Sequence, residues 1–304
     1  MNEQQRPLLL FPQPTASERE KRTPGFSRLS IPSAQRQFER IGPKFGALQD
    51  AFNARRVQLQ AVTPNDEPEM VVVFETVGSV EDFIKAVRKI PGLEWLLDAD
   101  ESDIQPDEDF FNENDRAKPL SGRIYLLGSN QQALSEVISL WNRYRDNPQV
   151  TLAHGLAKWK DAFKHLRDVR FWGTQDRIRP DVRQYLQDCL DGGDTTIRFE
   201  VEAWCYSSAA KNERAKAELT QLVGVLGGRI LQSALLENIA YHGFLIELPA
   251  QGVRSLLSDA PPALVLSERV MLFRPRGQAP ILFIYGSKGA ARGVDAAWRR
   301  GAGR

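Results

Sequence analysis

One stretch of strictly alternating residues constrains the fold of this chain most. From Ile197 to Glu202, apolar side chains alternate with charged ones, which is the period-two pattern of a half-buried β-strand. This strand is predicted to run over Ile197–Tyr206. The pattern then predicts a helix at 209–226, strands at 229–236 and 239–248, a short helix at 249–258 and a last strand at 264–273. The resulting order, β-α-β-β-α-β over residues 196–273, is that of a ferredoxin-like unit.

Most of the same order is found upstream. Met70–Glu75 is a β-branched run typical of a buried strand, and the spacing from Ser79 to Asp82 indicates a capping box that opens a helix. The later predicted elements are strands at Leu93–Leu97 and Gly122–Leu127, a helix at Asn130–Tyr144, and helical stretches at Gly155–Val169 and Asp181–Leu190. No fourth strand is recognisable, so this first unit is incomplete.

The two units indicate an α+β chain. Before them, Phe38, Ile41, Phe45, Leu48 and Phe52 recur at spacings of three and four, which predicts one amphipathic helix that Gly42-Pro43 bends or restarts. The predicted organisation is a disordered segment (1–30), an amphipathic helix (31–60), a first ferredoxin-like unit plus helical segment (68–192), a second ferredoxin-like unit (195–276) and a disordered Gly/Ala/Arg-rich tail (277–304).

Composition narrows the class of protein. The 304 residues carry 40 Lys and Arg against 39 Asp and Glu, so the formal net charge of +1 gives no electrostatic basis for binding nucleic acid or an anionic membrane. The first residues lack the basic and apolar segments of a signal peptide. The apolar runs Leu8–Phe11 and Ile281–Tyr285 are far shorter than the roughly 20 residues that span a bilayer. We therefore expect a cytoplasmic protein.

RNA binding is a possibility to weigh because RNA-recognition modules share the β-α-β-β-α-β order. Tyr241 and Phe244 on the third strand partly imitate the aromatics that stack on bases in such modules. However, the second unit carries equal numbers of basic and acidic side chains, so the electrostatic attraction that supplies most affinity is missing. The sequence thus predicts no nucleic-acid partner.

The acidic segment Asp98–Asp115 raises the possibility of a calcium site. Asp98, Asp100 and Ser102 occupy the first three ligand positions of an EF-hand-like loop. The sixth position is Asp103 where a glycine makes the sharp turn, and the twelfth is Asp109 where a bidentate glutamate is required. A solvated acidic loop is the favoured interpretation.

No catalytic, metal or cofactor site can be assembled from the remaining motifs. The histidines His154, His165 and His242 have no other metal ligand at helical spacing, and the cysteines Cys189 and Cys205 lie in no metal-binding pattern. No Gly-x-Ser-x-Gly occurs, and the glycines after the helix at 209–226 mark its C-terminal end, whereas a phosphate cradle lies at a helix start. We predict no catalytic residues and no cofactor.

Several short blocks, taken together in order, resemble a known family. They are Phe74–Phe83 (FETVGSVEDF), Pro91–Trp95 (PGLEW), Pro106–Phe110 (PDEDF), Lys118–Gly122 (KPLSG), Gly155–Trp159 (GLAKW), Leu166–Arg170 (LRDVR) with Trp172-Gly173, Ile239–His242 (IAYH) and Phe273–Pro275 (FRP). Over about residues 5–278, the chain resembles the long region that precedes the catalytic domain in a group of bacterial subtilisin-like serine peptidases.

The resemblance implies a role without catalysis. Family propeptides are single β-α-β-β-α-β domains that fold against the protease, so residues 195–276 would be a propeptide-like inhibitor or folding assistant. The partner would be a subtilisin-like catalytic domain, with an AAA-type ATPase as a further possible partner. The Asp, His and Ser blocks of the triad lie further downstream in the family, so we expect a truncated, inactive chain whose residues after Gln278 are an out-of-frame tail.

The resemblance also singles out one candidate contact. Arg274, Pro275, Arg276 and Gly277 follow the last apolar residues of the second unit, and proline favours an extended backbone that suits a segment lying along a protease cleft. The alternative is that these residues only link two domains. Two other functions stay open: a stand-alone protein-binding module with tandem ferredoxin-like domains, and a chain that is a serine-type endopeptidase by family but inactive.

Overall fold

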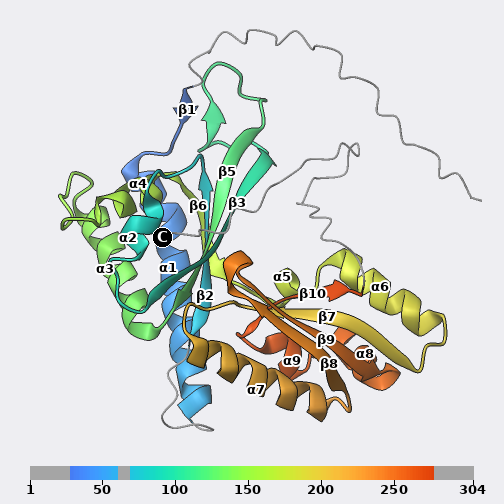
Figure 1. The fold of residues 1–304 in the computed structure, drawn as a ribbon. Helices are drawn as coiled ribbons and strands as arrows, with labels where there is room; N and C mark the ends of the chain where they lie inside the picture. The colour runs from blue at the N-terminus through green and yellow to red at the C-terminus, as the bar shows by residue number, and fades with distance from the viewer. Residues whose placement is uncertain (1–27, 61–68, 277–304) are drawn as a thin grey trace, which may run out of the picture.

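The computed structural model describes residues 28–60 and 69–276 (Figure 1). Its elements form an α+β fold with two four-stranded antiparallel sheets, each with helices against it. A further two-stranded ribbon pairs β1 (Leu29–Ser30) with β4 (Phe111–Asn112). The predictions for residues 1–27 and 277–304 lie outside the described residues. No described helix is both long enough and apolar enough to cross a bilayer.

The first sheet has the strand order β3-β5-β2-β6. Its central strand β2 (Met70–Val77) pairs with β5 (Leu120–Ser129) on one side and with β6 (Leu166–Phe171) on the other. The edge strand β3 (Leu93–Ile104) pairs with β5. The run of valines in β2 suits a strand that is buried on both faces, and seven of its eight residues are buried.

The strand β6 corrects the sequence prediction, which assigned Gly155–Val169 to a helix and left the fourth strand unidentified. The helix α4 covers only Ala157–His165, and the strand begins directly at Leu166. Three of the six strand residues are charged, so the segment lacks the apolar run that marks β2. Its charged side chains are held by partners far along the chain, which include Glu75 and Glu101 for Arg167.

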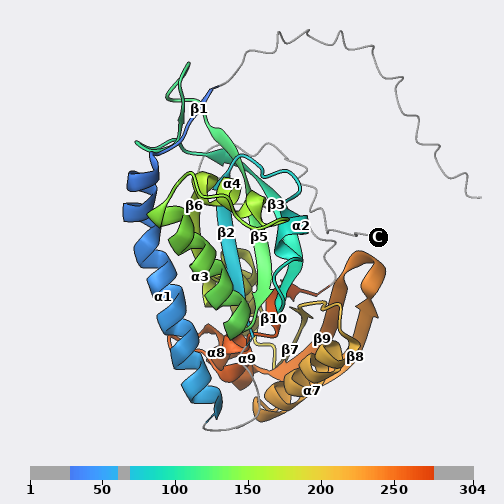
Figure 2. The same cartoon turned by 90° about the vertical axis from the view of Figure 1, so that its left-hand side faces the viewer.

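Four helices lie against one face of the first sheet (Figures 1 and 2). They are α1 (Ala34–Gln60), α2 (Phe83–Val87), α3 (Gln131–Asp146) and α4. The predicted stripe is confirmed, because Ile41, Phe45, Leu48 and Phe52 are all buried. The helix α1 runs through Pro43 without restarting. A proline inside a helix costs about 3 kcal/mol, and burial of these four side chains, at roughly 1.5–3 kcal/mol each, outweighs that cost.

One predicted helix start differs from the structure. The capping box expected from Ser79 to Asp82 does not form: α2 begins at Phe83, and its N-cap Asp82 has a left-handed backbone (φ 58°) without a side-chain cap. By contrast, α3 is capped by Asn130, whose side chain accepts a hydrogen bond from the Ala133 amide at 2.9 Å.

The second sheet has the strand order β10-β7-β9-β8. Its strands are β7 (Thr196–Ala203), β8 (Arg229–Leu236), β9 (Tyr241–Pro249) and β10 (Val270–Pro275), and its helices are α7 (Ala209–Val225), α8 (Ala250–Leu257) and α9 (Ala263–Leu266), with a 3₁₀ turn at Glu237–Ile239. The glycines end α7 as predicted, and Gly227 has a left-handed backbone with a φ of 72°. The last strand is shorter than predicted, because Leu264 and its neighbours form α9.

The helical segment between the sheets packs into the second core. The helices α5 (Thr174–Arg177) and α6 (Pro180–Asp191) follow β6, and Ile178, Val182 and Leu186 are buried with the apolar face of β7. The sequence prediction grouped this segment with the first unit, up to residue 192. Its apolar spacing identifies a helix but carries no information about which sheet that helix covers.

The second unit covers the other face of the first sheet. There, Val71, Val73, Leu97 and Leu126 form one buried cluster with Trp204, Tyr206 and Met271 of the second unit. The indole of Trp172 lies 5.6 Å from that of Trp204 in an edge-to-face arrangement and donates a hydrogen bond to the Met271 carbonyl. The two units are therefore joined by an apolar core of their own.

Ion pairs border this joint. Glu69, just before β2, binds Lys211 at 2.7 Å and Arg269 at 2.8 Å, both from the second unit. Burial raises the pKa of the Glu69 carboxyl, but the hydrogen bonds and positive charges of Lys211 and Arg269 together outweigh burial and lower this pKa. Glu94 of β3 accepts hydrogen bonds from the amide and hydroxyl of Ser207.

Trp204→Ala tests the joint. Loss of this fully buried indole leaves a cavity between the units, so we expect the free energy of unfolding in urea to fall by about 3–5 kcal/mol. Val225→Ala is the control, since its side chain is 77% exposed and the change should stay within about 0.5 kcal/mol. Equal, small losses in the two variants would contradict a packed joint.

Candidate functional site

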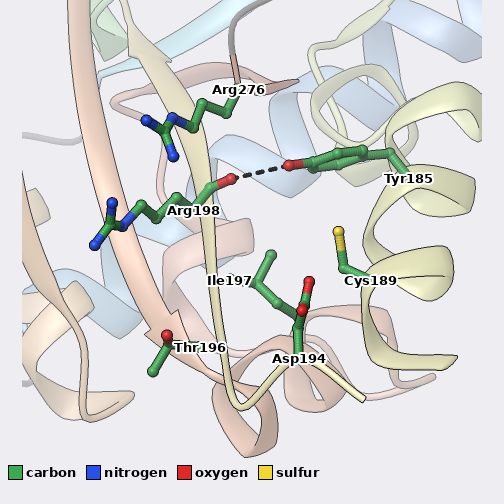
Figure 3. Close-up of a pocket in the computed structure, with 7 residues that line it drawn as sticks. All are labelled: Tyr185, Cys189, Asp194, Thr196, Ile197, Arg198 and Arg276. Atoms are coloured by element: carbon green, nitrogen blue, oxygen red, sulfur yellow. Dashed lines mark hydrogen bonds between the residues drawn. The ribbon is translucent and has the colours of Figure 1, made fainter. Parts of the chain in front are cut away.

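A shallow pocket lies where α6 faces the beginning of β7 (Figure 3). Its volume is about 290 Å³. The pocket is lined by side chains from α6, from the loop before β7, from β7 itself and from the residue after β10: Tyr185, Cys189, Asp194, Thr196, Ile197, Arg198 and Arg276. It therefore lies beside the place where the described chain leaves the second sheet.

The strand lengths explain why a hollow forms here. The last paired residue of β10 is Pro275, which lies opposite Phe199, so β10 pairs with β7 only as far as that residue. Tyr185 of α6 reaches across instead, and its hydroxyl donates a hydrogen bond to the Arg198 carbonyl at 3.1 Å (Figure 3). Burial and, next, the neighbouring Cys189 raise the pKa of the Tyr185 phenol.

The chemistry of the lining suits binding rather than bond cleavage. The lining contains two guanidinium groups, those of Arg198 and Arg276, and one carboxylate, that of Asp194. Arg198 is also held by Glu247 at 2.6 Å. Cys189 is the nucleophilic side chain of the pocket, and none of the seven lining residues is a histidine that could activate it. The part of β7 before Phe199 is not paired with β10. A chain segment that approaches this open part of β7 would meet its backbone groups and the guanidinium of Arg276.

Of the four predicted contact residues, the structure places one, Arg276, at this pocket. Arg274 and Pro275 belong to strand β10 rather than to a tail beyond it, and Arg276 is the pocket-lining residue that follows. Gly277 lies outside the described residues. Arg274 points to the other side of the sheet from the core and binds Glu202 at 2.5 Å. The carboxylate of Glu202 is fully buried and the guanidinium of Arg274 is 22% exposed.

The acidic segment is not one continuous loop. Its first part belongs to β3, which extends to Ile104, seven residues beyond the predicted end at Leu97. Asp98 and Asp100 there bind Arg123 of the neighbouring strand at 3.4 and 2.5 Å. These two carboxylates are therefore cross-strand ion-pair partners of Arg123. No cluster of three or more metal-ligating side chains occurs among residues 28–60 and 69–276.

The histidines have separate structural surroundings. His165 ends α4, with its Nδ1 3.0 Å from the Val77 carbonyl. His242 is buried in β9, where its ring lies 4.6 Å from that of Phe244. Burial lowers the pKa of the His242 imidazole, against a hydrogen bond with the Trp204 backbone that raises it. His242 is thus a packed side chain of the second sheet.

Comparisons with known proteins add no identification. No protein-family model matches the chain, and no match was found among curated proteins or among solved structures. The resemblance of the short sequence blocks to subtilisin-like peptidases therefore stays a prediction.

Arg274→Met tests whether Arg274 has a structural role. This change leaves the buried Glu202 carboxylate without its guanidinium partner, so we expect the free energy of unfolding to fall by about 3 kcal/mol. The double variant Arg274→Met/Glu202→Gln should regain part of this loss, because a neutral amide is less costly to bury. The measurement is equilibrium unfolding in urea.

Arg229→Met is the matched control for this experiment. Arg229 also pairs with a carboxylate of the second sheet, but its side chain is 70% exposed, so the loss should stay below about 1 kcal/mol. If Arg274→Met costs no more than Arg229→Met, the buried ion pair does not stabilise the sheet.

Proposed function

We propose that this chain is a non-catalytic regulatory region that binds a subtilisin-like catalytic domain, and that its second unit acts like a propeptide. The observation that carries the proposal is the construction of that unit. Its elements follow β-α-β-β-α-β order, and its strands are arranged β10-β7-β9-β8, with the last strand at an edge. The chain then leaves this edge strand beside the arginine-lined pocket.

Strand order also supports the proposal that both units are ferredoxin-like. Numbered along each unit, the strands lie in the order four, one, three, two in both sheets, with every neighbouring pair antiparallel. The strand β6 supplies the fourth strand of the first unit. In this proposal the first unit is a rigid support, because the core around Trp204 fixes it to the second.

The short sequence blocks supply the identity of the proposed partner. They suggest a subtilisin-like catalytic domain and, as a second partner, an AAA-type ATPase, in the cytoplasm of a bacterium. Peptide backbone and positive charge at the open part of β7 are compatible with an extended, acidic protease segment at that place. The chain would then have no activity of its own and would act by binding to the catalytic domain of its partner.

An inhibition assay tests this proposal. The full chain is titrated into a purified subtilisin-like catalytic domain, and hydrolysis of a chromogenic peptide is followed. We expect stoichiometric inhibition, and Arg276→Ala should weaken it about tenfold or more, because Arg276 lies at the exit of the edge strand. Arg254→Ala on α8 is the control and should inhibit as the unchanged chain does.

Two results would contradict the proposal. One is full protease activity at about a hundredfold excess of the chain. The other is covalent labelling of the chain itself by a fluorophosphonate probe, because that would show an activated serine and an enzyme.

A stand-alone protein-binding module is the second candidate. The observation that favours it is a group of exposed apolar side chains on and just after β8, Leu231, Leu235, Leu236 and Ile239, whose exposed fractions range from 37% to 52%. This group lies at the opposite edge of the second sheet from β10. Capture of a partner by this edge, with no effect on any subtilisin-like protease, would favour the module over the regulatory region.

A further inference from the structure

The strand β8 is an edge strand with an unusual surface. It pairs with β9 on one side only, and six of its eight residues are exposed (Figure 2). From Ile230 to Leu236 the sequence ILQSALL contains no charge, no proline and no glycine. An unpaired strand edge of this composition is a template for pairing with another strand.

The other three sheet edges are protected. The edge strand β3 carries several carboxylates, and Asp98 and Asp100 are tied to Arg123. The edge strand β6 is covered by α1, since Gln37 donates a hydrogen bond to the Leu166 carbonyl at 2.6 Å. The edge strand β10 ends in Pro275, and its residue Met271 is buried at the joint between the units. Among the described edges of the two four-stranded sheets, only β8 is left without such protection along its length.

The sequence of β8 is complementary to itself in antiparallel orientation. We propose that two copies of this chain pair through β8 about a two-fold axis at Ser233, which joins their second sheets into one sheet of eight strands. This register places Leu231 opposite Leu235 of the other copy, Gln232 opposite Ala234, and Ser233 opposite Ser233. Because directly opposite residues share a face of the sheet, each apolar pair meets on the same side.

The face assignments agree with this register. Within the sheet, Leu235 lies opposite His242 and Ser233 opposite Phe244, so both face the core side. A bulge lies between Ile230 and Gln232, so the pairing with β9 is regular from Gln232 to Leu236 and Leu231 is the extra residue of the bulge. Leu231 is exposed at this edge, where Leu235 of the other copy can reach it.

Charge at the two ends of the strand supports the same register. Arg229 begins β8, and Glu237 follows its last residue. A two-fold axis at Ser233 brings the Arg229 end of each copy beside the Glu237 end of the other, so opposite charges meet at both ends of the interface. A pairing of this kind is isologous, since the same surface serves in both copies and the assembly closes as a dimer.

Charge substitutions at Ser233 test this interface. Sedimentation velocity of the full chain should show a monomer–dimer equilibrium over a concentration series. Ser233→Lys and Ser233→Glu each place two like charges on the axis, so each should weaken dimerisation tenfold or more. An equimolar mixture of the two variants should restore the dimer, because lysine then faces glutamate.

Ser135→Lys and Ser135→Glu are the matched controls. Ser135 is exposed on α3, which lies against the first sheet and not on the unit that carries β8, so these variants should dimerise as the unchanged chain does. A chain that stays monomeric at every concentration up to about 0.1 mM overturns the proposal. So does a dimer that neither Ser233 variant weakens, or variants whose mixture shows no recovery. A monomer whose β8 amides exchange slowly would also overturn it, by showing that residues 277–304 of the same chain cover the edge.

Discussion

The burial of β2 on both faces is the constraint on which the rest of the structure depends. Side chains alternate across a strand, so Val72 and Phe74 face one side of the first sheet while Val71 and Val73 face the other. All four are at most 2% exposed. Apolar side chains on both faces of a strand need a cover on each side, and the helices α1, α2, α3 and α4 supply only one of them. The second unit supplies the other.

This requirement explains how the second unit is held. The second unit contributes three buried side chains to the shared core. Trp204 and Tyr206 follow the end of β7, and Met271 lies within β10. Attachment at β10 leaves β8, on the far side of the sheet, as the free edge. The joint between the units and the proposed interface between copies are thus at opposite edges of one sheet. The pocket beside Arg276 lies at the other end of β7 and β10 from the joint.

Local patterns in the sequence predict much of this fold. The valine run from Met70, the alternation from Ile197 and the helical stripe from Phe38 each indicate the correct element, because each reports burial that is visible from neighbouring residues. The strand β6 could not be predicted in this way. Arg167, Asp168 and Arg170 occupy half of it, and their partners are Glu75, Glu101, Lys44 and Asp176, three of which are far away in the sequence. Only the folded chain shows that this charged segment completes a sheet.

The candidate site was less predictable than the fold. The sequence pointed to Arg274 and Pro275 as a projecting tail, yet Arg274 is bound to Glu202, 72 positions earlier in the chain. Of the four predicted residues, Arg276 lies at the pocket. The other lining residues, such as Tyr185 and Asp194, carry no motif, and they come together because α6 packs on the second sheet. A pocket assembled by long-range packing leaves no local signature.

Differential scanning calorimetry of the full chain tests most directly whether the second unit is an integral cover of the first sheet. If the core around Trp204 joins the units as described, they should unfold in one transition whose calorimetric enthalpy equals its van't Hoff enthalpy. Two resolved transitions, one for each sheet, would contradict the account.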